Sequence, residues 1–183
     1  MQLTSQQTLP VSQAIAWEAL NDVGMLQAAI PGCESLTASG ENQYDVALTA
    51  AVGPVKAKFK GKLKLADLNP PESYNLAFEG QGGAAGHGKG TASVRLEPTG
   101  PNTTTLHYTA NAQVGGKIAQ IGSRLIDMAA QKMAGEFFSN FNAALEAKYP
   151  PPLEEEVAAP PPPEVPKSAF GRFLAWLKGL FGQ

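Results

Sequence analysis

The chain has 183 residues, of which 43% are hydrophobic and 16% are charged, and its formal net charge is −2. This length predicts one domain with its own core plus an appended segment. The acidic pI of about 5.7 argues against a nucleic-acid-binding protein, because such domains usually carry a strongly basic surface. Cys33 is the single cysteine, which excludes a disulfide within the chain, and we expect a reducing compartment.

The first thirty residues predict one strand and two short helices. Gln2 to Leu9 is expected to be a strand that Pro10 ends. Helices are expected over about 13–20 and 21–29, and the Pro31-Gly32 pair stops the second one. This start has neither the basic nor the apolar region of a signal peptide, and no later window reaches the ~20 apolar residues of a spanning helix.

The middle of the chain alternates between apolar and polar residues with a period of two. Such alternation predicts strands with one buried face, and the short turns between them predict antiparallel pairing. The clearest case is Val55 to Leu65, where lysine occupies every second position. The expected strands are 34–37, 43–52, 55–65, 74–79, 88–97 and 105–114.

The period returns to 3.6 from Lys117 to Tyr149, which predicts one long helix. Its expected apolar stripe consists of Ile118, Ile121, Leu125, Met128, Ala129, Met133, Phe137, Phe141 and Leu145. Only this helix is large enough to cover the apolar face of the sheet. The predicted fold class is therefore α+β, a curved antiparallel sheet of about seven strands wrapped around a long C-terminal helix.

Many of the positions that face this helix are small. They are Ala57, Gly61, Gly88, Gly90, Ala92, Ala110 and Ala112. Close-packed interiors leave no such volume unfilled, so either the helix sits deep in the sheet or an apolar cavity lies between them. Both interpretations remain open at this level.

The C-terminal part of the chain predicts two further segments after a domain at 1–149. Residues 150–167 are rich in proline and glutamate, which is typical of a stiff, extended linker. Residues 168–183 predict an amphipathic helix with a broad apolar face and a cationic side. This helix fits either a membrane surface or a partner protein, and we favour the membrane. The residues expected to meet lipid are Phe170, Arg172, Phe173, Leu174, Trp176, Leu177, Lys178, Leu180 and Phe181.

Catalytic and metal-binding patterns are weak. His87, His107 and Cys33 have no partner at ligand spacing, so we expect no metal site and no enzyme activity. The glycines between Gly80 and Gly90 are followed by a strand instead of the helix that a dinucleotide site needs, so they predict a hairpin loop, either a gate or a partner contact. The lysines of the 55–65 strand are either a solvated face or a docking surface for an acidic partner or anionic lipid.

Two motifs carry a resemblance to a known family. They are Ile30-Pro31-Gly32-Cys33-Glu34-Ser35-Leu36 and Gly115-Gly116-Lys117-Ile118-Ala119-Gln120-Ile121-Gly122-Ser123-Arg124-Leu125-Ile126. Over residues 1–148 the chain resembles the carbon monoxide dehydrogenase G-subunit (CoxG) family, of the helix-grip superfamily of START and Bet v 1-like domains. The resemblance implies a sheet that grips the long helix around an elongated apolar cavity. Candidate cavity residues are Phe59, Tyr74, Leu76, Phe78, Tyr108, Ile121, Arg124, Leu125 and Met128. Arg124 is either a surface ion-pair residue or a polar contact for a ligand carbonyl.

The resemblance also implies a function. Family members are thought to recruit a molybdenum-containing hydroxylase of the carbon monoxide dehydrogenase type to the cytoplasmic membrane and to support electron transfer to the respiratory chain. A cavity next to a membrane-binding helix leads to the hypothesis that the domain binds a lipophilic quinone. Two other functions compete with it, namely a soluble carrier of a hydrophobic molecule or lipid whose tail docks to a protein, and an enzyme that uses the cavity for hydrolysis or cyclisation.

Overall fold

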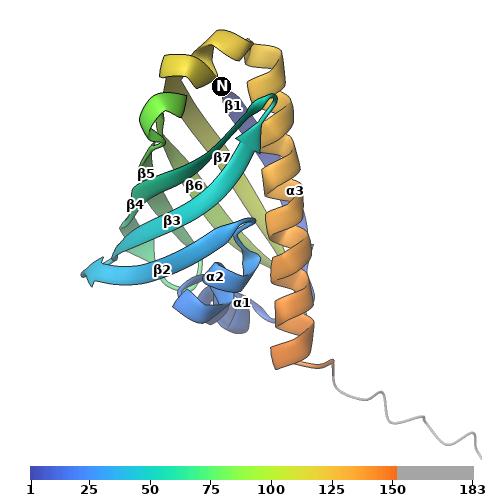
Figure 1. Cartoon of the computed structure of the whole chain (residues 1–183). Coiled ribbons are helices and arrows are strands. Elements are labelled where there is room, and N and C mark those ends of the chain that lie inside the picture. Colours follow the sequence, from blue (N-terminus) through green and yellow to red (C-terminus); the bar gives the residue numbers. More distant parts are fainter. Residues whose placement is uncertain (152–183) are drawn as a thin grey trace, which may run out of the picture. The chain divides into compact units, whose positions relative to one another are not determined.

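The computed structural model describes residues 1–151 (Figure 1). Seven strands and three α-helices make up this part of the chain, with two short 3-10 helices, η1 and η2, between them. The strands are β1 (Gln2–Leu9), β2 (Cys33–Gly40), β3 (Gln43–Val52), β4 (Val55–Asn69), β5 (Ser73–Gln81), β6 (His87–Gly100) and β7 (Thr103–Gly115). The helices are α1 (Gln13–Leu20), α2 (Val23–Ala29), η1 (Gly83–Ala85), η2 (Gly116–Ile121) and α3 (Ser123–Lys148).

All seven strands belong to one antiparallel sheet with the order β1-β7-β6-β5-β4-β3-β2. Strands β2 to β7 follow one another as a meander, whereas β1 pairs with β7 along the other edge, where Leu3 lies opposite Ala110. The sheet curves strongly, α3 runs along its open side, and α1 and α2 cover the lower end in the view of Figure 1. The predicted α+β helix-grip fold with seven strands is confirmed, although β4 and β6 are longer than predicted.

The packed core lies at the lower end, where α1, α2 and the C-terminal half of α3 meet the sheet. Leu9, Leu106, Phe141 and Leu145 are fully buried there. Thr104 is buried among them, and its hydroxyl donates a 2.8 Å hydrogen bond to the Val11 carbonyl, so the polar group is satisfied. This end of the domain therefore has the close packing of an ordinary protein interior.

The long helix begins later than predicted. Residues 116–121 form the 3-10 helix η2, and α3 starts only at Ser123. Gly122, with a φ of 98°, separates the two, and this left-handed conformation favours glycine. The apolar stripe predicted to run from Ile118 to Leu145 is therefore divided between two elements with different axes.

The predicted linker and tail helix lie outside the described residues from position 152 onward. Within residues 1–151, no helix combines the length and the apolar character that crossing a bilayer requires.

Candidate ligand cavity

Two apolar chambers lie between α3 and the inner face of the sheet. The outer chamber has a volume of about 370 Å³ and is bordered on α3 by Ile126, Ala129, Ala130 and Met133. The inner chamber has a volume of about 220 Å³ and is bordered on α3 by Phe137 and Phe138. Both chambers share Ile30 and Leu63 as wall residues, so they lie end to end along the helix. At 1.5 Å per residue, the helix segment that borders them is about 18 Å long.

Aromatic rings fill part of the space that the glycines of the sheet leave. A Cβ atom at Gly82 would lie 2.4 Å from the Phe59 ring, and one at Gly90 would lie 2.6 Å from the Phe78 ring. Both rings therefore rest against glycine backbone and form part of the wall of the outer chamber. The small residues noted in the sequence thus accommodate phenylalanine rings as well as a cavity.

A small second core closes the upper end of the outer chamber. Val55, Ala85 and Ile118 are buried together where β4, η1 and η2 meet. Ile121 packs against this cluster and reaches the turn between β3 and β4, where it lies 3.5 Å from the position of a Cβ added at Gly53. The glycine-rich segment predicted as a hairpin loop thus includes η1, and Ala85 within it is part of this closure.

Three tyrosines distinguish the inner chamber from the outer one. Tyr44, Tyr74 and Tyr108 line it, and its other wall side chains are Leu20, Leu26, Ile30, Leu63, Leu65, Leu76, Ala92, Val94, Leu106, Phe137 and Phe138. The Tyr74 ring meets Trp17 edge-on at 5.6 Å, and the Tyr108 ring stacks on Phe138 at 5.3 Å. Burial raises the pKa of the Tyr74 phenol above its ordinary value, and the nearby Tyr44 raises it further.

The structure brings most of the predicted cavity residues together. Phe59 and Phe78 line the outer chamber, while Tyr74, Leu76 and Tyr108 line the inner one. Ile121 contributes to the closure at the upper end instead of the chamber wall.

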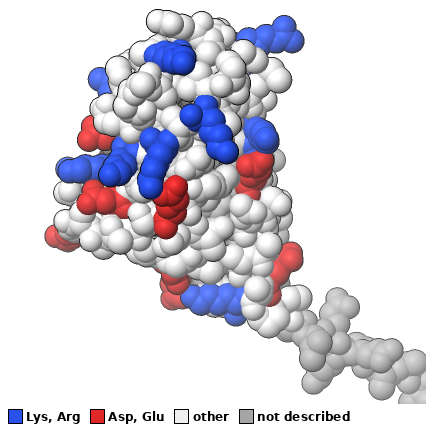
Figure 2. Space-filling view, viewed as in Figure 1, with Lys and Arg blue, Asp and Glu red and all other residues white. Residues whose placement is uncertain are grey.

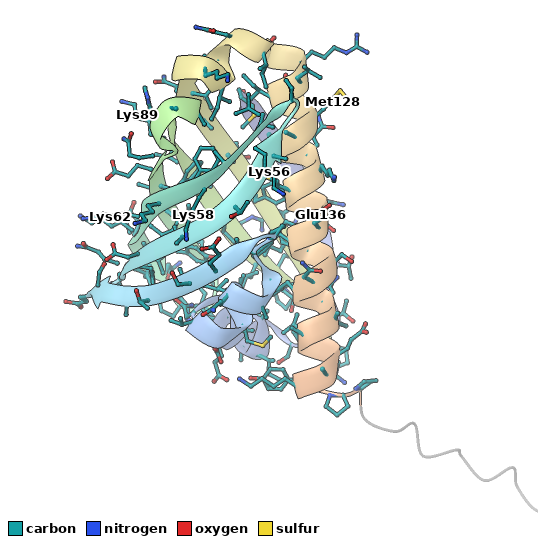
Figure 3. All side chains as sticks on the ribbon, in the orientation of Figure 1. Lys56, Lys58, Lys62, Lys89, Met128 and Glu136 are labelled. Carbon is teal, nitrogen blue, oxygen red and sulfur yellow. The ribbon has the colours of Figure 1, made fainter. Side chains whose placement is uncertain are left out.

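Arg124, Leu125 and Met128 differ from the prediction, because all three are exposed. Met128 is 57% exposed and points away from the sheet in Figure 3. The predicted stripe drifts around the helix, whereas at 100° per residue positions 126 and 130 lie within about 60° of Phe141 and positions 125 and 128 lie on the opposite side. Ile126 and Ala130, which the prediction missed, occupy the wall instead.

Tyr44 and Phe138 were also missed. Tyr44 faces inward on β3, paired with Leu63 of β4, and the alternation along 43–52 contains that information. Phe138 is buried next to Phe137, and the two rings meet edge-on at 5.0 Å. A stripe with one residue per turn selects only one member of such an adjacent pair.

Residues 1–151 contain no group of three or more His, Cys, Asp and Glu side chains placed to hold a metal ion. His107 contacts Glu97 at 2.9 Å on the outer face of the sheet. Partial burial raises the pKa of the Cys33 thiol, which disfavours the nucleophilic thiolate. The walls of the inner chamber thus offer apolar contact and phenol groups, whereas the border of the outer chamber also includes Lys62, Glu79, His87 and Lys89.

The lysines of β4 form a stripe on the outer face of the sheet (Figures 2 and 3). It consists of Lys56, Lys58, Lys60, Lys62 and Lys64, all of them exposed. Lys58 pairs with Glu34 at 2.5 Å and thereby lowers the pKa of that carboxyl. The other four lysines make no ion pair with any residue of the described domain.

A family comparison identifies this cavity-bearing domain. Residues 6–146 match the family described as the G subunit of carbon monoxide dehydrogenase (CoxG). The chain belongs to the CoxG family. The match spans β1 to the last turn of α3, and the family resemblance seen in the sequence motifs is confirmed. No curated protein matches the chain.

Solved structures share the fold of this CoxG-family domain. A conserved protein from Geobacillus kaustophilus is 30% identical over 81% of this chain and 97% of that one, with a TM-score of 0.77. A START superfamily protein from Mycobacterium smegmatis is 10% identical, covers 80% of this chain and 98% of its own, and has a TM-score of 0.62. The Zhui aromatase/cyclase from Streptomyces sp. R1128 is 13% identical, covers 81% and 94%, and has a TM-score of 0.59. At these lower identities the likeness concerns the fold alone.

Proposed function

We propose that this CoxG-family protein is a non-catalytic accessory protein that carries a lipophilic quinone. In this proposal it recruits a molybdenum-containing enzyme of the carbon monoxide dehydrogenase type to the cytoplasmic face of the cell membrane and supports electron transfer to the respiratory chain. The observation that carries the proposal is the pair of adjoining apolar chambers along α3, which share Ile30 and Leu63 as wall residues.

The shape and chemistry of the chambers support a long apolar ligand with a ring. Two chambers end to end suit a molecule with a compact head and an extended hydrocarbon chain. The walls at α3 are Ile126, Ala129, Ala130, Met133 and the two phenylalanines 137 and 138, which provide only apolar contacts. Burial of such a chain is favourable by about 25 cal/mol for each Å² of apolar surface removed from water.

The family description supports the proposed protein partner, and the sequence of the C-terminal tail supports the proposed contact with the membrane. The family is described as belonging to carbon monoxide dehydrogenase, which points to a protein partner of that kind. The four lysines of the β4 stripe without an ion pair in the described domain offer a surface for an acidic partner. The tail of residues 168–183 has the apolar and cationic residues of an interfacial helix.

A second function remains a candidate because the same chambers would suit it. A soluble carrier of another hydrophobic molecule or lipid would need the cavity but no membrane, and its tail would dock to a protein instead. An enzyme is less well supported, because no carboxylate or histidine lines the inner chamber and the matched family is named for an enzyme's subunit.

Cargo and partner are tested together by native mass spectrometry of the full chain purified from its own host. We expect a bound species with the mass of a quinone and a complex with a molybdenum hydroxylase. Recovery of the protein with a different hydrophobe and no such complex would favour the soluble carrier.

Membrane binding is tested by flotation with anionic liposomes. The full chain should float, whereas a chain cut after Pro166 and the variant Phe173→Glu/Leu177→Glu should stay at the bottom, because the apolar face is lost. The variant Ala175→Glu/Gly179→Glu is the matched control, because it adds the same charge on the opposite face of the predicted helix. Equal flotation of both double variants would refute binding through the apolar face.

A further inference from the structure

The inner chamber holds phenol groups that form no hydrogen bond within the described domain. Tyr74 is only 6% exposed, yet its hydroxyl takes part in none of the side-chain hydrogen bonds of residues 1–151. The hydroxyls of the half-buried Tyr44 and Tyr108 take part in none of them either. Buried polar groups in proteins are almost always paired, and each exception calls for an explanation. The surroundings of these hydroxyls therefore need to explain why they lack a partner.

All three tyrosines form part of the wall of the chamber. In the described domain, Asn142 Oδ1 is the only buried side-chain nitrogen or oxygen that has neither a partner nor access to open space. The Tyr74 oxygen is therefore not sealed within packed atoms, and its side chain forms part of the wall of the inner chamber. A hydroxyl that is withdrawn from bulk solvent but open to a cavity is placed to bind whatever enters that cavity.

The tyrosine rings are held in place by packing. Trp17 of α1 contacts Tyr74 edge-on, and Phe138 of α3 stacks on Tyr108. Tyr44 of β3 and Tyr74 of β5 both line this one chamber. Preorganised donors lose little freedom when a ligand binds, which favours a specific contact.

The wall residues of the inner chamber limit which kinds of ligand can bind there. No lysine, arginine, aspartate or glutamate lines it, so a charged ligand group would lose its hydration without gaining a partner. A phenol kept protonated by its surroundings donates a hydrogen bond, and because no cationic side chain lines the chamber, a neutral acceptor is favoured over an anion. A volume of about 220 Å³ is larger than the ~150 Å³ cavity that is known to accept a benzene ring.

We propose that the inner chamber binds the ring of a neutral, carbonyl-bearing ligand, with Tyr74 and Tyr44 donating hydrogen bonds to a carbonyl oxygen. The hydrocarbon chain of the ligand then lies in the outer chamber, so the ligand enters with its polar ring first. This assignment rests on the proposed carrier function and adds the recognising residues and the orientation of the cargo.

The test compares two probes that differ only in their carbonyl groups. The first is a short-chain prenylated 2-methyl-1,4-naphthoquinone, and the second is the prenylated 2-methylnaphthalene with the same skeleton and no oxygen. Dissociation constants are measured by titration calorimetry on the full chain and on Tyr74→Phe, Tyr44→Phe and Tyr149→Phe. Tyr149 follows the last turn of α3, does not line the chamber and serves as the matched control.

We expect Tyr74→Phe to raise the dissociation constant of the quinone about tenfold, Tyr44→Phe to raise it less and Tyr149→Phe to leave it unchanged. Binding of the hydrocarbon should be unchanged or tighter in Tyr74→Phe, because an unpaired hydroxyl has been removed. The infrared carbonyl stretch of the bound quinone should move to higher frequency in Tyr74→Phe, which reports the hydrogen bond directly.

The outcomes separate this inference from the function on which it rests. If the parent protein binds both probes equally and Tyr74→Phe changes neither affinity nor the carbonyl stretch, the tyrosine site is wrong although the protein still carries a hydrophobe. If the parent binds neither probe, the carrier function fails, and the site fails with it.

Discussion

The two halves of α3 face very different surroundings. Toward its C-terminal end, Phe141 and Leu145 are fully buried against α1, α2 and the sheet. Toward its N-terminal end, Ala129, Ala130 and Met133 border the outer chamber, and Met128 on the opposite side is exposed. One helix thus contributes close packing at its C-terminal end and the wall of the outer chamber toward its N-terminal end.

The residues themselves explain the contrast. The packed half of α3 presents phenylalanine and leucine at the inward positions, and two additional helices close that end of the sheet. The hollow half presents Ala129 and Ala130 between Ile126 and Met133, opposite a sheet whose inward positions include Gly61, Gly88 and Gly90. Small residues on both facing surfaces leave space that the rings of Phe59 and Phe78 fill only in part.

Truncating a side chain in each half gives the largest expected contrast. Phe141→Ala should lower the free energy of unfolding by about 3–5 kcal/mol, because it opens a cavity in a closed core. Met133→Ala should cost clearly less, because Met133 already borders open space. Urea denaturation of both variants, with exposed Met128→Ala as the control, measures the difference. Similar losses for Phe141 and Met133 would contradict the division of the helix.

Filling the hollow half should affect binding more than stability. Ala129→Leu places extra methyl groups in the outer chamber and should weaken binding of the prenylated quinone by about tenfold or more, while the melting temperature changes little. Ala143→Leu makes the same substitution at an exposed position of α3 and serves as the matched control. Unchanged affinity in Ala129→Leu would mean that the cargo does not lie along this part of the helix.

A smaller effect on stability is expected at the ion pair that joins the C-terminal end of α3 to the start of α2. The Asp22 carboxylate accepts hydrogen bonds from the Lys148 ammonium at 2.9 Å and from the Met25 backbone at 3.1 Å, and these contacts lower its pKa below the ordinary value of 3.8. A depressed pKa contributes stability that is present above pH 3.8 and is lost as the pH falls through the folded value.

Asp22→Asn keeps a good helix cap but removes the charge, so it should lower the melting temperature slightly at pH 7. The difference from the parent should shrink as the pH falls below 3.8. Thermal unfolding followed across this range measures it, and Lys148→Met should remove most of the pH-dependent part. A difference between Asp22→Asn and the parent that does not change with pH would exclude the ion pair as its cause.

The sequence predicted the fold better than the cavity. Period-two alternation and the 3.6-residue stripe were enough for seven strands and a covering helix, because each element buries one face. The inward positions Phe59, Phe78, Tyr74 and Tyr108 followed from the alternation of the strands. The errors at Leu125 and Met128 arose because the predicted stripe drifted around the helix, and both residues lie on the side of α3 opposite Phe141.

The division of the cavity could not be predicted from the sequence. Which small residues leave space and which ones accommodate a neighbouring ring depends on three-dimensional packing, as Gly90 and Phe78 show. That Tyr44 joins Tyr74 across β3, β4 and β5 depends on the register and curvature of the sheet.

The edge-on contact between Trp17 and Tyr74 gives the protein an optical reporter at the inner end of the cavity. The chain has two tryptophans, so replacing Trp176 with phenylalanine leaves Trp17 as the only indole. Because quinones absorb ultraviolet light and quench nearby indole emission, the arrival and departure of cargo can be followed in real time from the fluorescence of this one ring, without any attached dye.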